Sequence, residues 1–159
     1  MSSPLSAAEI ETILRSSLVY RIAGASRGQP YCVPVSLAYD GQSLFGQSSP
    51  GRKLEMMRES AELCVETEQI DDLMNWRSVI AWGRYEELSG EEALRTLRAY
   101  FDRVVPFIRD LESGRQGYPH SVEEIATRGA VYRIRLLAKS GRFESKKGEY
   151  LSPFRRNGF

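Results

Sequence analysis

The stretch PYCVPVSLAYDGQSLFGQ, residues 30–47, contains the strongest indication of a fold class. Residues 31–39 are mostly apolar and aromatic, which is typical of a β-strand. Asp40-Gly41 is a strong turn signal, and an apolar return strand begins at Ser43. The pattern predicts an antiparallel hairpin. Pro34 lies inside the first strand and has no N–H to donate, so we expect that strand at a sheet edge or at a bulge.

Apolar runs on both sides of this hairpin extend the same pattern. The strands that we expect are residues 18–24, 63–68, 76–88 and 130–145, and the loops between them include 25–29 and 70–75. The helices that we expect are residues 7–17 after a capping box at Ser6 and Glu9, then 53–60, then about 89–113 with a break at Pro106, and a short one at 122–128. Strands joined by tight turns, without regular strand–helix alternation, favour a mainly β fold: an antiparallel barrel with peripheral helices.

Length and charge limit the classes of protein. The 159 residues fit a single domain, which we take as residues 1–159. Lys and Arg number 22 against 21 Asp and Glu, a net charge of +1, so charge offers no basis for binding nucleic acid or an anionic membrane. No segment approaches the roughly 20 apolar residues that span a bilayer. The first residues are amphipathic and acidic, unlike a signal peptide, so we expect a cytoplasmic protein.

Few residues are available to bind a metal. The chain has two cysteines, Cys32 and Cys64, both in apolar runs, and we expect them to be buried free thiols. A zinc site needs more ligands than these. His120 is the sole histidine and lies in a region rich in glycine and proline. We therefore predict no metal site.

The segment SSPGRK, residues 48–53, has the composition of an anion-binding turn. Its hydroxyl groups donate hydrogen bonds, its glycine lets the backbone approach a ligand, and its two cations match a phosphate. The helix that we expect next adds free N–H groups. The candidate ligands for an anion are Gln47, Ser48, Ser49, Arg52 and Lys53. A serine-rich helix cap with two solvated cations is the alternative, and the spacing is not that of a Walker loop.

Four stretches lie in order along the chain: GQPYCVPVS at 28–36, LF at 44–45 leading to GRK at 51–53, CVE at 64–66, and WRSVIAWG at 76–83. This ordered set resembles the FMN-binding split-barrel proteins related to pyridoxamine 5′-phosphate oxidase, and most closely their nitroimidazole-resistance-like branch. Together the four stretches extend over most of residues 6–145. Each motif is weak alone, and their order and spacing carry the resemblance.

The resemblance implies an antiparallel split β-barrel that forms a homodimer with FMN in clefts between the subunits. Pro34, Val35 and Ser36 would lie along the isoalloxazine ring, largely through backbone groups. Residues 47–53 would hold the FMN phosphate. Trp76, Arg77 and Ser78 would border the flavin, partly from the other subunit. The implied activity is that of an oxidoreductase with a small-molecule substrate.

Two positions depart from the resemblance. Branch members often carry a histidine directly after the aromatic residue of the second hairpin strand, where this chain has Gly46 after Phe45. Ser140-Gly141-Arg142 replaces a frequent Thr-Gly-Lys near the end of the last strand, which keeps the glycine and a cation. The first change leaves a deazaflavin or heme as alternatives to FMN.

The sequence contains no persuasive Ser-His-Asp or Cys-His set, so no catalytic residue is assigned. A flavin enzyme does not require one, because the cofactor carries the redox chemistry. A flavin-binding sensor or carrier module without turnover is the alternative to an oxidoreductase.

Overall fold

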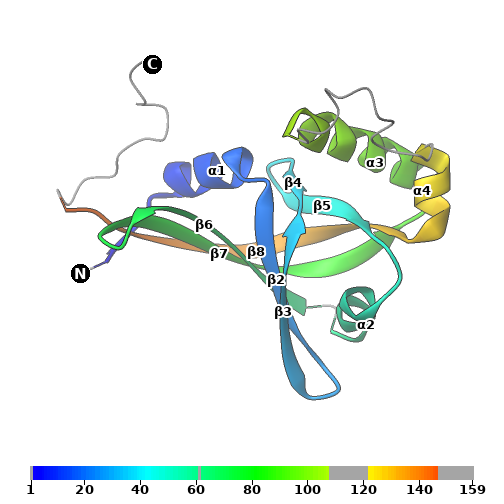
Figure 1. The fold of residues 1–159 in the computed structure, drawn as a ribbon, viewed down its shortest axis with the longest axis horizontal. Coiled ribbons are helices and arrows are strands. Elements are labelled where there is room, and N and C mark those ends of the chain that lie inside the picture. The colour runs from blue at the N-terminus through cyan, green and yellow to red at the C-terminus, as the bar shows by residue number, and fades with distance from the viewer. Residues whose placement is uncertain (1, 61, 108–121, 147–159) are drawn as a thin grey trace.

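The computed structural model describes residues 2–60, 62–107 and 122–146, in which a curved antiparallel sheet carries helices on its outside (Figure 1). The strands are β1 (Ser3–Pro4), β2 (Val19–Ser26), β3 (Gln29–Ser36), β4 (Ala38–Tyr39), β5 (Ser43–Ser48), β6 (Glu62–Asp72), β7 (Asn75–Leu88) and β8 (Ala130–Glu144). The helices are α1 (Ala7–Ser16), α2 (Arg52–Glu59), α3 (Gly90–Val104) and α4 (Val122–Arg128), and a 3-10 turn at Val105–Phe107 follows α3.

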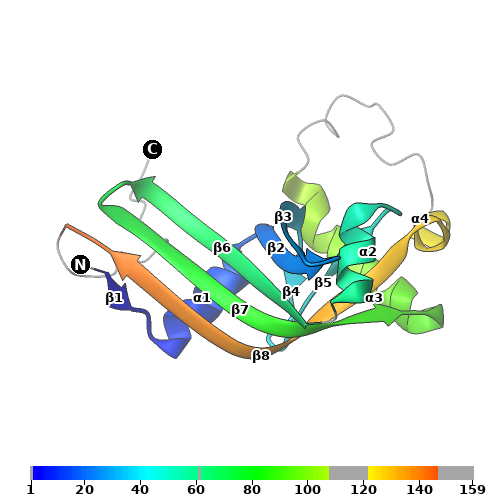
Figure 2. The same cartoon turned by 90° about the horizontal axis from the view of Figure 1, so that it is seen from below.

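The strands follow the order β3-β2-β6-β7-β8-β5-β4, and β1 pairs with the end of β8. Figure 2 shows β6, β7 and β8 as long bent strands that extend beyond the rest of the sheet. The strands at the two ends of this order, β3 and β4, share no ladder. Near one point these ends come close, since a Cβ placed on Gly46 of β5 would lie 3.2 Å from the carbonyl oxygen of Ser36 in β3. The sheet is therefore an antiparallel barrel, as the tight turns predicted, and it has an open seam, as the resemblance to split-barrel proteins implied.

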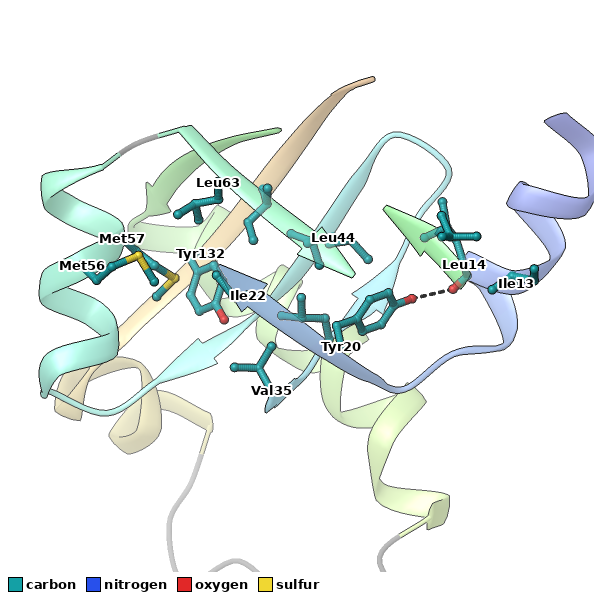
Figure 3. Close-up of a cluster of buried hydrophobic side chains, with 14 of the residues drawn as sticks. Ile13, Leu14, Tyr20, Ile22, Val35, Leu44, Met56, Met57, Leu63 and Tyr132 are labelled. Carbon is teal, nitrogen blue, oxygen red and sulfur yellow. Dashed lines mark hydrogen bonds between the residues drawn. The ribbon is translucent and has the colours of Figure 1, made fainter. Parts of the chain in front are cut away.

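Apolar side chains from the sheet and from α1 and α2 fill the barrel (Figure 3). Tyr20 and Tyr132 are fully buried there, and the Tyr20 hydroxyl donates a 2.6 Å hydrogen bond to the carbonyl oxygen of Leu14 in α1. A second cluster under α3 includes Leu97 and Val131. α3 thus covers the outside of the β4–β5–β8 part of the barrel, while α1 packs against β7 and β8.

The predicted capping box at the start of α1 is confirmed. The backbone N–H of Ser6 donates to the carboxylate of Glu9 at 2.7 Å, and the N–H of Glu9 donates to Ser6 Oγ. Both bonds satisfy N–H groups that a helix start leaves without a partner. Ile10, Ile13 and Leu14 share the buried face, as their spacing predicts.

Two predicted loops, 25–29 and 70–75, are wrong in length. Strand β2 ends at Ser26 and β3 begins at Gln29, so the turn between them consists of Arg27 and Gly28 alone. Both turn residues have positive φ, 51° and 76°, which is the geometry of the tight hairpin turn that matches strand twist. The β6–β7 connection likewise consists of Leu73 and Met74 alone. These strands therefore extend beyond their apolar residues into the polar residues that the sequence assigned to loops.

The single strand expected at 31–39 is also wrong. β3 pairs with β2, whereas only the short β4 pairs with β5, so the chain changes partner at the fully buried Leu37. The segment is mostly apolar on both sides of Leu37, so the sequence pattern does not mark the change of strand partner. The turn at Asp40 is confirmed, since its carboxylate accepts the N–H groups of Gln42 and Ser43. Pro34 lies on an edge strand, as predicted, in a ladder with no bulge.

The remaining helices start near their predicted positions, and α3 ends two residues before Pro106. His120 lies outside the described residues. Both cysteines are free, but the expected burial of Cys32 is wrong, because the strand period of two turns its side chain outward. Cys64 is half-buried. None of the helices in the described ranges is both long and apolar enough to cross a bilayer.

Candidate functional site

A cavity of about 360 Å³ opens where β5 ends and α2 begins. Its walls are formed by Tyr31 of β3 and by the whole turn from Gln47 to Lys53. The structure therefore gathers all five residues that the sequence proposed as anion ligands around one cavity. We call this cavity the turn pocket.

The first turn of α2 contributes backbone donors to the turn pocket. Gly51 is the N-cap residue and provides no side-chain cap, and the first intrahelical bond runs from the N–H of Glu55 to the carbonyl of Gly51. The N–H groups of residues 52–54 thus have no acceptor within the helix. Gly51 has φ of 151°, a conformation that favours glycine. The glycine allows the chain to enter the helix at this angle.

The two cations of the turn pocket have different surroundings. Lys53 is half-buried, and burial alone lowers the pKa of its ammonium group. No carboxylate forms an ion pair with Lys53 in the described part of the chain. Arg52 is exposed, and its guanidinium carbon lies 5.0 Å from the centre of the Tyr31 ring. Its Nη2 also donates to Gln29 Oε1 at 3.3 Å.

Sequence reasoning assigned no role to Gln29 or Tyr31, although both belong to the GQPYCVPVS stretch. Their proximity to the turn pocket depends on the tertiary contacts of β3 with Arg52, and no local sequence pattern predicts such contacts. The two serines of the turn also differ. Ser48 is buried and donates its hydroxyl to the carbonyl of Ser49 at 3.0 Å, whereas Ser49 is exposed. Ser49 is thus the hydroxyl better placed to meet a ligand.

Pro34, Val35 and Ser36 lie on edge strand β3, whose second side has no strand partner. Val35 points into the barrel core, and Pro34 and Ser36 are exposed on the other face. Backbone groups along such an edge are available to a ligand. That these residues contact a flavin largely through backbone groups stays a prediction.

Trp76, Arg77 and Ser78 do not share one face of β7. Arg77 is 8% exposed and lies on the α1 side, where it donates to Gln69 Oε1 at 3.0 Å. Gln69 in turn donates to Ser16 of α1. Trp76 and Ser78 point to the opposite face, and Ser78 donates to a carboxylate there at 2.7 Å. Arg77 is therefore linked through Gln69 to α1.

Segment 76–78 is also remote from the turn pocket within one chain, as Figures 1 and 2 show. A row of paired residues links Cys32, next to Tyr31, across β2 and β6 to Trp82. Segment 76–78 begins six residues before Trp82, about 20 Å along an extended strand. One chain alone does not bring segment 76–78 to the turn pocket.

The exposed face of β2, β6, β7 and β8, which we call the outer face, carries large apolar side chains. Val19 is 59% exposed, Ile80 37%, Trp82 45% and Leu137 63%. A larger cavity of about 490 Å³ lies on this face beside Trp82, and its lining contains no Lys or Arg. It is therefore a poor site for an anion, unlike the smaller turn pocket.

Gly46 is a packing position. A Cβ there would lie 2.9 Å from Leu37 Cδ2 and 3.2 Å from the carbonyl oxygen of Ser36. Both distances are shorter than ordinary contacts, so a histidine in this backbone would displace the buried Leu37. Within the described residues no three His, Cys, Asp or Glu side chains gather as a metal site requires.

Comparison with known proteins links this geometry to a family. The family model of pyridoxamine 5′-phosphate oxidase matches residues 6–143. A crystal structure of an FAD-binding protein from Mesorhizobium loti is 29% identical, with a TM-score of 0.72 over 91% of this chain and 99% of that one. A candidate 5-nitroimidazole antibiotic resistance protein from Bacteroides thetaiotaomicron is 17% identical, with a TM-score of 0.68 over 90% of this chain and 87% of that one, and shows the shared fold alone.

An uncharacterised protein of Rhizobium meliloti, RA0666, is 31% identical over 84 residues. That match covers 53% of this chain and 56% of the relative, so the chain spans little more than half the length of this curated relative. The structural similarities confirm the split-barrel fold. Since the family model extends over nearly all of the described barrel, the chain belongs to the pyridoxamine 5′-phosphate oxidase family.

Proposed function

We propose that this protein binds FMN and, as a cytoplasmic homodimer, transfers electrons to a small-molecule acceptor. Membership of the pyridoxamine 5′-phosphate oxidase family supports a flavin site, as does the 29% identical structure that is named FAD-binding. The single observation that carries the proposal is the turn pocket, where Lys53 is half-buried beside Arg52 and forms no ion pair with any residue that the structure describes.

The residues of the turn pocket fit a phosphate monoester. Burying a cation without a counter-ion is unfavourable, and a bound dianion would offset that cost for Lys53. Arg52 offers planar paired donors, and Lys53 adds a compact charge. The free N–H groups of residues 52–54 at the start of α2 complete the set of donors. These donors come from a single short segment, the turn and the first residues of α2.

The remaining groups of the flavin would extend from the turn pocket toward the open seam. The free edge of β3 at Pro34–Ser36 presents backbone donors and acceptors to the polar edge of a planar ring. A bound flavin supplies the hydride and electron chemistry. The protein binds the phosphate, orients the ring and covers it from water. We assign no catalytic side chain, because the flavin itself carries out the redox chemistry.

The outer face supports the homodimer. Val19, Ile80, Trp82 and Leu137 are exposed apolar side chains on this face, of the kind that a stable interface buries. A second copy packed there would cover these side chains. It would also supply Trp76 and Ser78, which lie on the same face, to the flavin of its partner. That arrangement accounts for the distance between segment 76–78 and the turn pocket within one chain.

Anaerobic reduction of the FMN-loaded protein tests the proposed activity. We expect NADH or NADPH to bleach the flavin absorbance, and a quinone or nitroaromatic acceptor to restore it over many cycles. Flavin that stays bound but is never reduced by a nicotinamide, or that reacts for one cycle alone, would show a binding module without turnover. Free FMN at the same concentration is the control for reactions away from the protein.

A further inference from the structure

Two side chains of the neighbouring hairpin hold the guanidinium of Arg52 at the turn pocket. We propose that Tyr31 and Gln29 are positioning residues that aim Arg52 at the phosphate of the bound nucleotide, an inference that rests on the proposed function. Neither residue is required to touch the ligand. Their effect on affinity would pass through Arg52.

The geometry for this role is specific. The Arg52 guanidinium carbon lies 5.0 Å from the Tyr31 ring centre, within the range of a cation–π contact. The Arg52 Nη2 donates to Gln29 Oε1 at 3.3 Å. The Tyr31 ring is itself half-buried and packs against the barrel core. The ring is therefore a fixed platform, whereas an exposed arginine without contacts samples many rotamers.

The acceptor that orients Arg52 is neutral. Other exposed arginines nearby bind carboxylates, such as Arg58 with Glu87 and Arg27 with Glu59. Arg52 forms no ion pair among the described residues, and its one side-chain acceptor is the amide of Gln29. An amide fixes the direction of the guanidinium without neutralising it. The remaining N–H donors and the full positive charge stay available to an anion.

Lys53 and Arg52 are held at the turn pocket in different ways. Lys53 is half-buried in the wall of the turn pocket and has no side-chain partner within the described ranges, so burial alone fixes the position of its charge. Arg52 is exposed, and its contacts with Tyr31 and Gln29 of β3 are the ones that the described residues offer to hold it at the turn pocket. Loss of those contacts would leave Lys53 in place and release Arg52.

Equilibrium dissociation constants for FMN and for riboflavin test the inference, because riboflavin lacks the phosphate. We expect Tyr31→Leu to weaken FMN binding about two- to fivefold, the worth of an exposed cation–π contact. Tyr31→Phe keeps the ring and should retain FMN affinity. Gln29→Glu should weaken FMN binding most at low salt, since a carboxylate would neutralise Arg52. Riboflavin affinity should be unchanged in all three.

Arg52→Ala decides between the possible mechanisms. We expect it to weaken FMN binding about tenfold or more, as for a lost charged hydrogen bond. Adding Tyr31→Leu to Arg52→Ala should cause no further loss if Tyr31 acts through Arg52. Arg15→Ala is the matched control, because Arg15 also lies over a tyrosine, Tyr39 at 5.6 Å, but away from the turn pocket. That control should bind FMN normally.

Four results would overturn the inference. An equal loss from Tyr31→Leu with or without Arg52 would mean that Tyr31 acts on the ligand itself. A loss of riboflavin affinity in Tyr31→Leu would mean a general structural defect. Normal FMN affinity in Tyr31→Leu, with weak binding in Arg52→Ala, would refute the positioning role and leave the phosphate site standing. Normal FMN affinity in Arg52→Ala would remove the phosphate assignment as well.

Discussion

Two tyrosines in the barrel core have the same burial and different hydroxyl environments. Tyr20 and Tyr132 are both 0% exposed, and burial raises the pKa of each phenol. The Tyr20 hydroxyl donates to the carbonyl of Leu14, whereas the Tyr132 hydroxyl has no hydrogen-bond partner among the described residues. Burying a polar group without a hydrogen-bond partner costs desolvation free energy that no hydrogen bond offsets.

We therefore predict opposite effects of removing the two hydroxyls. Tyr20→Phe should lower the free energy of unfolding by about 1 kcal/mol, the net worth of a typical hydrogen bond. Tyr132→Phe should leave the free energy of unfolding unchanged or raise it by up to about 1 kcal/mol. Urea titration of the two variants and the wild type measures both. Destabilisation of Tyr132→Phe equal to that of Tyr20→Phe would show a partner for the Tyr132 hydroxyl.

The chemistry of the turn pocket was predictable at the residue level, and the residues around it were not. Composition alone placed two cations and two hydroxyls beside a helix start, and the structure gathers them around one cavity. The contacts of Arg52 with Tyr31 and Gln29 join parts of the chain more than 20 residues apart, so they depend on packing. The same holds for Gly46, whose contact with Leu37 becomes visible only in the folded barrel.

At the scale of elements, a charged cluster fastens β7 to β8. Glu86 of β7 accepts from Arg133 at 2.6 Å and from Arg135 at 3.0 Å, both on β8. These hydrogen bonds with Arg135 and Arg133 lower the pKa of the Glu86 carboxyl to about 2. A folded-state pKa below the ordinary value of 4.5 stabilises the fold above about pH 4.5, and the gain is lost as pH falls toward 2.

Glu86→Gln should therefore destabilise the protein at pH 7 and not at pH 2. The Glu86 side chain is 32% exposed, so we expect solvent-screened effects of about 1 kcal/mol in the free energy of unfolding at pH 7. Glu62→Gln is the control, because Glu62 is 75% exposed in its pair with Arg84. Denaturant titrations across pH measure the difference. A Glu86→Gln effect that is equally large at pH 2 would contradict the electrostatic explanation.

Element types followed from the sequence, whereas strand partners did not. Apolar alternation and turn residues identified the strand segments, and the capping box identified the start of α1. The change of partner at Leu37 and the face of Arg77 depend on register, which apolar runs leave undetermined. The polar ends of β6 and β7 are held by backbone pairing rather than by burial, so hydrophobicity missed them.

At the scale of the whole molecule, the outer face exposes large apolar side chains, among them Ile80, Trp82 and Leu137. Trp82→Glu would place a charge on this face. We expect this variant to sediment as a monomer, and we expect the wild type to sediment at twice the 18.0 kDa chain mass. Phe107→Glu is the control, since Phe107 is 61% exposed after α3 and lies away from the outer face. A wild type that is monomeric at micromolar concentration would refute the proposed homodimer.

We propose that the turn pocket holds the phosphate of a flavin. The most direct test is the visible absorbance spectrum of the protein after incubation with FMN and gel filtration. The wild type and an Arg95→Ala/Arg98→Ala control, which removes two exposed cations from α3, should retain the flavin band. Arg52→Ala/Lys53→Ala should elute folded and colourless. Retention of FMN by that double variant at the wild-type level would contradict the account.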